Sequence, residues 1–139
     1  MKTLHIIIPG KPIAKRRPRF SRRGTYSDQG EEKLRFQQYA FIQIPKNHTR
    51  APLSVKYTFF MPRPISHYGS GKNNGTLRKS APKHHTKKPD LDNLEKFASD
   101  CLTGLVWKDD SQIVRSITEK RYSKDPRTEI RITEMEDFG

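Results

Sequence analysis

The chain has 139 residues, of which 32% are hydrophobic, and its 28 Lys and Arg against 15 Asp and Glu give a formal net charge of +13. No apolar run approaches the roughly 18 residues of a membrane span, and the short N-terminal apolar stretch lacks the cleavage site of a signal peptide. The single cysteine, Cys101, excludes an intramolecular disulfide framework and a Cys-x-x-Cys site. We therefore expect one domain over residues 1–139, cytoplasmic and without a membrane partner.

Charge is divided unevenly along the chain. Residues 1–89 hold 20 Lys and Arg but only three acids, a net charge of +17, whereas residues 90–139 hold eight basic and twelve acidic residues, a net charge of −4. A solvated basic surface is one interpretation. Self-repulsion on this scale favours a polyanionic partner, nucleic acid above all.

The N-terminal third predicts a strand, a basic loop and a helix. Leu4–Ile8 is apolar and ends at Pro9-Gly10, as a short strand does. In the basic loop 10–27, residues 11–23 hold seven Lys and Arg in thirteen positions and two prolines, which favours an extended arm over a helix. Phe20 and Tyr26 lie among these arginines and either stack on DNA bases or anchor the loop to the core. Residues 28–44 predict a helix that Pro45 ends.

The rest of the chain predicts three strands and a second helix. Residues 53–59 alternate apolar and polar side chains, the period of a half-buried strand. Segment 62–88 lacks core-forming residues, so we expect a long mobile basic loop. Residues 93–103 carry one apolar helical stripe that includes Cys101, and residues 112–122 and 128–135 predict an antiparallel hairpin. The elements predict an α+β fold: one small domain with a mixed or antiparallel sheet of about four strands and two helices.

Carboxylates gather in segment 88–114. Asp90 and Asp92 are two residues apart in an extended stretch, so their side chains point the same way. Asp92, Lys96 and Asp100 then follow at i, i+4 and i+8, on one polar helical stripe. Asp109-Asp110 precede a strand, and we expect the hairpin to bring them beside Asp90 and Asp92.

A strongly basic protein has a physical reason to collect carboxylates only if something neutralises them. Two carboxylates about 5 Å apart repel by roughly 3 kcal/mol at an effective dielectric constant near 20. A divalent cation removes that repulsion, and Mg²⁺ is typically held by one or two carboxylates together with substrate phosphate. Such a site activates water and stabilises charge at phosphorus. A basic surface beside this acidic pocket predicts a nuclease.

Each acid also has a structural interpretation. Asp92-x-x-Glu95 matches a capping box, Asp109-Asp110-Ser111 matches a turn, and Asp100 with Lys96 matches an ordinary pair on a helix surface. The pattern alone leaves these alternatives open.

The stretch KPDLDNLEKFASD at residues 88–100, followed by DDSQIV at 109–114, closely resembles the RusA-like Holliday junction resolvases. GKPIAKRRPRF at 10–20 is similar to the opening strand and basic loop of that family. The resemblance implies a homodimeric crossover junction endodeoxyribonuclease that depends on Mg²⁺, with Mn²⁺ as a substitute, and uses no small-molecule cofactor. It implies resolution of four-way DNA junctions by paired nicks in recombination and repair, in the nucleoid; a chromosomal or prophage origin stays open.

The resemblance also implies roles for individual residues. Asp90, Asp92 and Asp110 fall on the family's catalytic metal-binding aspartates, and Lys96 falls on its catalytic lysine. Under this hypothesis the contacts to DNA come from a basic set: Lys15, Arg16, Arg17, Arg19, Arg22, Arg23, Lys87 and Lys88. The competing hypotheses are a non-catalytic basic nucleic-acid-binding protein and a nuclease that acts on other branched DNA.

Overall fold

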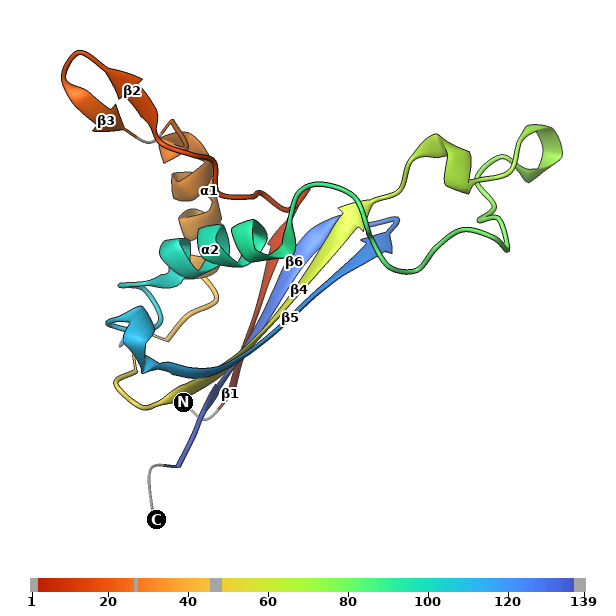
Figure 1. Cartoon of the computed structure of the whole chain (residues 1–139). Coiled ribbons are helices and arrows are strands. Elements are labelled where there is room, and N and C mark those ends of the chain that lie inside the picture. Colours follow the sequence, from red (N-terminus) through yellow and green to blue (C-terminus); the bar gives the residue numbers. More distant parts are fainter. Residues whose placement is uncertain (1–2, 27, 46–48, 137–139) are drawn as a thin grey trace.

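A four-stranded sheet carries two α-helices on one face in the computed structural model, which describes residues 3–26, 28–45 and 49–136 (Figure 1). The strands of this sheet are β1 (Thr3–Pro9), β4 (Leu53–Pro62), β5 (Ile113–Ser123) and β6 (Arg127–Glu134). The helices are α1 (Gly30–Phe41) and α2 (Leu91–Leu102). The predicted α+β class is thereby confirmed. No helix in the described ranges is long and apolar enough to cross a membrane.

The order of strands differs from the sequence prediction. The sheet runs β1-β6-β4-β5, with β6 antiparallel to both β1 and β4 and with β5 parallel to β4. The predicted hairpin of residues 112–122 and 128–135 is therefore wrong, because β4 lies between β5 and β6. The short link between them crosses the end of β4, where the strand ends at Pro62, which has no N–H to extend the ladder. As the strand with the most buried side chains, β4 takes a central place.

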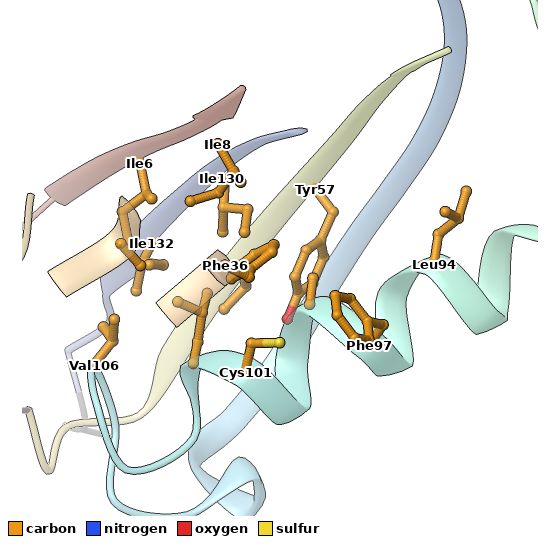
Figure 2. Packing of buried hydrophobic residues seen from close by; sticks show 14 of the residues in the cluster. Ile6, Ile8, Phe36, Tyr57, Leu94, Phe97, Cys101, Val106, Ile130 and Ile132 are labelled. Carbon is orange, nitrogen blue, oxygen red and sulfur yellow. The ribbon is translucent and has the colours of Figure 1, made fainter. Parts of the chain in front are cut away.

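The core fills the space between the helices and the sheet (Figure 2). Alternate residues of β1, β4 and β6 face the helices, and Phe36 of α1 meets Phe97 of α2 edge to face with ring centroids 5.9 Å apart. Cys101 and Trp107 are fully buried, which places both in the core. Each large apolar side chain buried in this way contributes about 1.5–3 kcal/mol.

Two projections extend from this body on either side (Figure 1). The first is a hairpin of β2 (Arg19–Ser21) and β3 (Gly24–Tyr26), which we call the arginine hairpin. Gly24, with φ of +116°, supplies the backbone conformation that its turn requires. The sequence predicted an extended arm here, since strands made of arginines show no apolar alternation. The second projection, residues 63–89, contains the short 3-10 turns η1 (Ile65–His67) and η2 (Gly71–Asn73).

Candidate active site

The N-terminus of α2 presents two carboxylates to solvent. Asp90 occupies the N-cap position, yet its side chain makes no capping hydrogen bond and is 54% exposed. Asp92 lies in the first helical turn and its side chain is 67% exposed. The partial positive charge at a helix N-terminus stabilises both carboxylates there. Because neither is used to hold the fold, both are available to a ligand.

The capping-box interpretation of Asp92 is wrong. Asp92 is inside α2 rather than at its cap, and Glu95 does not reach back to it. The Glu95 carboxylate instead accepts hydrogen bonds from the hydroxyls of Ser116 and Thr118 on β5, the second at 3.1 Å. Glu95 therefore fastens α2 to the sheet, a role that only the tertiary structure reveals.

A lysine accompanies each of the two exposed carboxylates. Lys88 Nζ lies 3.4 Å from the Asp90 carboxylate, and Lys96 Nζ lies 3.8 Å from Asp92 Oδ2. Exposed ion pairs of this kind contribute only about 0–1 kcal/mol. A stronger ligand can therefore displace either lysine at little cost, and Lys96 is then free to meet an anion beside Asp92.

Sequence reasoning missed Lys120. Its ammonium donates to the backbone carbonyls of Lys87 and Pro89, both at 2.8 Å. These two bonds fix the chain just before Asp90 against β5. No local pattern points to this, because Lys120 lies about 30 residues further along the chain than the segment it holds, at a sequence separation of 31 from Pro89.

The neighbouring acids Asp109 and Asp110 have different roles. Asp109 Oδ1 accepts from the Ser111 N–H at 3.0 Å, while Gln112 Oε1 accepts from the Asp109 N–H at 3.1 Å. The turn interpretation thus holds for Asp109, which caps the short turn η3 (Asp110–Gln112). The hydrogen bond from the Ser111 N–H lowers the pKa of Asp109, and the hydrogen bond and charge of Asp109 raise the pKa of Asp110. Asp110 is exposed and has no capping role.

Asp110 does not join Asp90 and Asp92 within one chain, contrary to the sequence expectation. Strand β5 runs back along α2: Lys120 lies level with Pro89, whereas Asp110 precedes Ile113, the first residue of the strand. Seven residues of β-strand span about 23 Å. Figure 1 places η3 beside the C-terminal end of α2, and Asp100 there helps to raise the pKa of Asp110. Across residues 3–26, 28–45 and 49–136, no three His, Cys, Asp or Glu side chains are placed to hold one metal ion.

Half of the predicted DNA-binding residues are engaged in ion pairs. Lys15 pairs with Asp100, so the interpretation of Asp100 as a surface partner of Lys96 is wrong. Arg16 Nη2 pairs with Glu32 at 2.6 Å, and Arg19 Nε with Asp28 at 2.8 Å. Lys88 pairs with Asp90, as described above. Burial alone would raise the pKa of Asp28, but Arg16 and Arg19 together hold it below its ordinary value.

The remaining members of the basic set are exposed, and within the described part of the chain their side chains have no ion pair or hydrogen bond: Arg17, Arg22, Arg23 and Lys87. Three of them lie on or just before the arginine hairpin, and Lys87 lies in the second projection. These four cations are the ones free to neutralise phosphate. Positive charge therefore flanks the exposed carboxylates of α2 on two sides.

Exposed carboxylates between cationic projections are compatible with metal-dependent hydrolysis of nucleic acid. A family model described as endodeoxyribonuclease RusA matches residues 9–133, which contain both helices and the whole of segment 88–114. An uncharacterized protein of Bacillus subtilis (strain 168), YqaN, is 33% identical over 141 residues, covering 97% of this chain and 99% of its own length. The chain belongs to the RusA endodeoxyribonuclease family.

Proposed function

We propose that this protein is a Mg²⁺-dependent endodeoxyribonuclease that resolves four-way DNA junctions by paired nicks. The observation that carries the proposal is the pair of exposed carboxylates, Asp90 and Asp92, that α2 presents without using either as a cap. Membership of the RusA family supports the endonuclease class, and with it the branched substrate.

The residues fit a hard divalent cation, because Asp90, Asp92 and Asp110 offer only oxygen ligands. Mg²⁺ needs no more than one or two carboxylates in addition to substrate phosphate, and Mn²⁺ accepts the same ligands. When bound, such a cation would polarise the scissile phosphate and activate water for attack on phosphorus. Asp90 and Asp92 would hold it from the end of α2.

Lys96 is one helical turn beyond Asp92 and is the nearest cation on that helix face. Its ammonium would donate to a phosphate oxygen and stabilise the negative charge that develops as the P–O bond breaks. The free cations Arg17, Arg22, Arg23 and Lys87 would neutralise backbone phosphates on either side of the cut. These contacts give affinity without reading sequence.

A homodimer suits the substrate. A four-way junction is approximately two-fold symmetric, and its resolution needs two cuts, which two identical sites related by a two-fold axis provide. Because Asp110 lies at the far end of α2 from Asp90, we propose that the dimer completes each site. Asp110 of the partner subunit would then join Asp90 and Asp92.

Incubation with a synthetic four-way junction tests the proposed activity. We expect symmetric nicks with Mg²⁺, none with EDTA, and none on a linear duplex. Asp90→Asn should abolish cutting while junction binding persists, because it removes a ligand and leaves the basic surface intact. Asp125→Asn, the same change at an exposed aspartate in the β5–β6 link, is the matched control and should cut normally.

Other outcomes would replace the proposal. Binding without cutting by the unaltered protein would make it a non-catalytic nucleic-acid-binding protein. Cutting of flaps in preference to four-way junctions would make it a nuclease for other branched DNA. Undiminished cutting by Asp90→Asn would remove this carboxylate from the active site.

A further inference from the structure

The arginine hairpin carries an aromatic side chain that is largely exposed to solvent. Phe20 is 85% exposed, more than any other phenylalanine in that part of the protein. The interpretation in which Phe20 anchors the basic loop to the core is therefore wrong. The side chain of Tyr26, the other aromatic residue of the hairpin, lies outside what the structure describes. A single exposed apolar side chain is common on protein surfaces, so it is the arginines around Phe20 that indicate a partner.

The ion pair of Arg19 fixes the face of the hairpin on which Phe20 lies. On the same strand, Arg19 Nε donates to Asp28 Oδ2 at 2.8 Å, just before the start of α1. Successive strand residues project to opposite faces. The ring of Phe20 therefore leaves the hairpin on the face opposite to that ion pair, with Thr25 as its cross-strand neighbour.

The hairpin is held in place from its base to its tip. At the base, the Lys15 N–H donates to the Asn93 carbonyl at 2.9 Å, and Arg16 pairs with Glu32 of α1. At the tip, the Ser21 hydroxyl donates to the Gly24 carbonyl and accepts from the Arg23 N–H, both at 3.2 Å. Since Asn93 is the residue after Asp92, Phe20 is tied through the hairpin to the helix end that carries the candidate catalytic carboxylates.

The surroundings of Phe20 identify the chemistry of its partner. The free guanidinium groups of Arg17, Arg22 and Arg23 attract a polyanion to the same projection. An aromatic ring among such cations stacks on nucleic-acid bases or inserts between them. In a continuous duplex both faces of each base pair are covered by stacking, whereas a branch point interrupts the stack.

We propose that Phe20 is a wedge that stacks on a base at the branch point of the DNA substrate. The inference rests on the proposed function and deepens it, because the wedge would distinguish a junction from a linear duplex. It would also set the distance between the branch and the cut, since the hairpin is tied to α2.

Equilibrium binding in EDTA, which prevents cutting, tests the wedge. The probes are a four-way junction with 2-aminopurine at the branch and a linear duplex of the same arm sequence. We expect the unaltered protein to raise 2-aminopurine fluorescence on binding the junction. Phe20→Ala should abolish this signal and lose on the order of tenfold in junction affinity, with duplex affinity unchanged. Phe20→Trp should preserve both readouts.

The matched control is Phe41→Ala, the same change at a 69% exposed phenylalanine at the other end of α1, and it should leave both readouts unchanged. An unaltered junction preference and fluorescence signal in Phe20→Ala would overturn the wedge, as would the absence of any junction preference in the unaltered protein. Nicking of junctions by Phe20→Ala with normal affinity would overturn the wedge but leave the proposed function standing. Loss of the signal in a protein that binds junctions without cutting them would support the wedge and overturn the proposed function.

Discussion

At the scale of single residues, the structure separates acids that hold the fold from acids that are free to act. Asp109 caps η3, and Glu95 ties α2 to β5. Asp90 occupies the N-cap position of α2, but its side chain makes no capping hydrogen bond. Asp110 is the first residue of η3, and the capping hydrogen bond of that turn comes from Asp109. The free carboxylates are the ones on which a cation can be bound without loss of a structural hydrogen bond.

Replacing Lys96 tests its assignment to the reaction. Lys96→Ala should slow nicking by about 10²-fold, the effect of removing one donor that stabilises transition-state charge. Binding of Mn²⁺, measured by calorimetry, should not weaken, because Lys96 is no ligand. Lys124→Ala, at an exposed lysine of the β5–β6 link, is the control. Equal rates for Lys96→Ala and the unaltered protein would leave the lysine as a surface partner of Asp92.

Cys101 provides a prediction about pH. Burial raises the pKa of its thiol from 9.0 to about 12. The unfolded thiol ionises near 9.0 and the folded thiol only near 12, so unfolding releases a proton in this range and stability must fall as pH rises through it. Cys101→Ala should show a smaller loss of stability between these pH values in urea unfolding. An identical pH dependence in both proteins would contradict the burial of the thiol.

At the scale of elements, the arginine hairpin combines anchored and free cations. Arg16 and Arg19 pair with acids of α1 and of the residues before it, whereas Arg17 has no partner among the described residues. Adjacent arginines in one sequence run thus have distinct physical roles. Counting the basic residues of the run overstates the charge available to DNA.

Arg16 and Arg17 should therefore behave differently on substitution. Arg17→Ala should lower the slope of log affinity against log salt by about 1, as expected for one lost phosphate contact. Arg16→Ala should leave that slope closer to its original value and instead loosen the hairpin, seen as faster amide exchange in β2 and β3. Identical salt slopes for the two variants would show that the pairing with Glu32 does not persist in solution.

The helices and strands were largely predictable from the sequence, whereas the pairing of the strands and the long-range contacts of their side chains were not. Apolar patterns and turn residues located both helices and all four strands of the sheet, and the apolar stripe of residues 93–103 correctly placed Cys101 in the core. The periodicity of apolar residues carries no information on which strands pair. The sequence therefore predicted that β5 pairs with β6, whereas the neighbour of β5 in the sheet is β4. The same limit explains why Lys120 was missed and why Asp110 was expected beside Asp90. Contacts over tens of residues depend on how the sheet is ordered.

At the scale of the whole molecule, the N-terminal end of α2, which carries Asp90 and Asp92, lies between the two projections (Figure 1). The excess of positive charge in residues 1–89 is carried partly by these projections, and the acids of α2 lie between them. This distribution would draw DNA towards the carboxylates of the proposed site, although the carboxylates themselves repel phosphate. It also accounts for the charge asymmetry seen in the sequence.

Mixing two inactive variants distinguishes a shared site from one within a single chain. Asp90→Asn and Asp110→Asn proteins should each fail to cut. Once subunits exchange, one site of the mixed dimer would combine an intact Asp90 with Asp110 of the partner subunit, and nicking should return to one strand. If both carboxylates act within one chain, both sites of every mixed dimer carry a substitution, and a gel assay would find no product.

The position of β6 has a consequence for biosynthesis. Residues 127–134 form an interior strand, between β1 and β4, although they come last among the elements. A nascent chain therefore holds an open gap in its sheet until these residues have left the ribosome, and contacts this distant in sequence form slowly. The proposed nuclease activity would therefore be withheld until synthesis of β6 is complete.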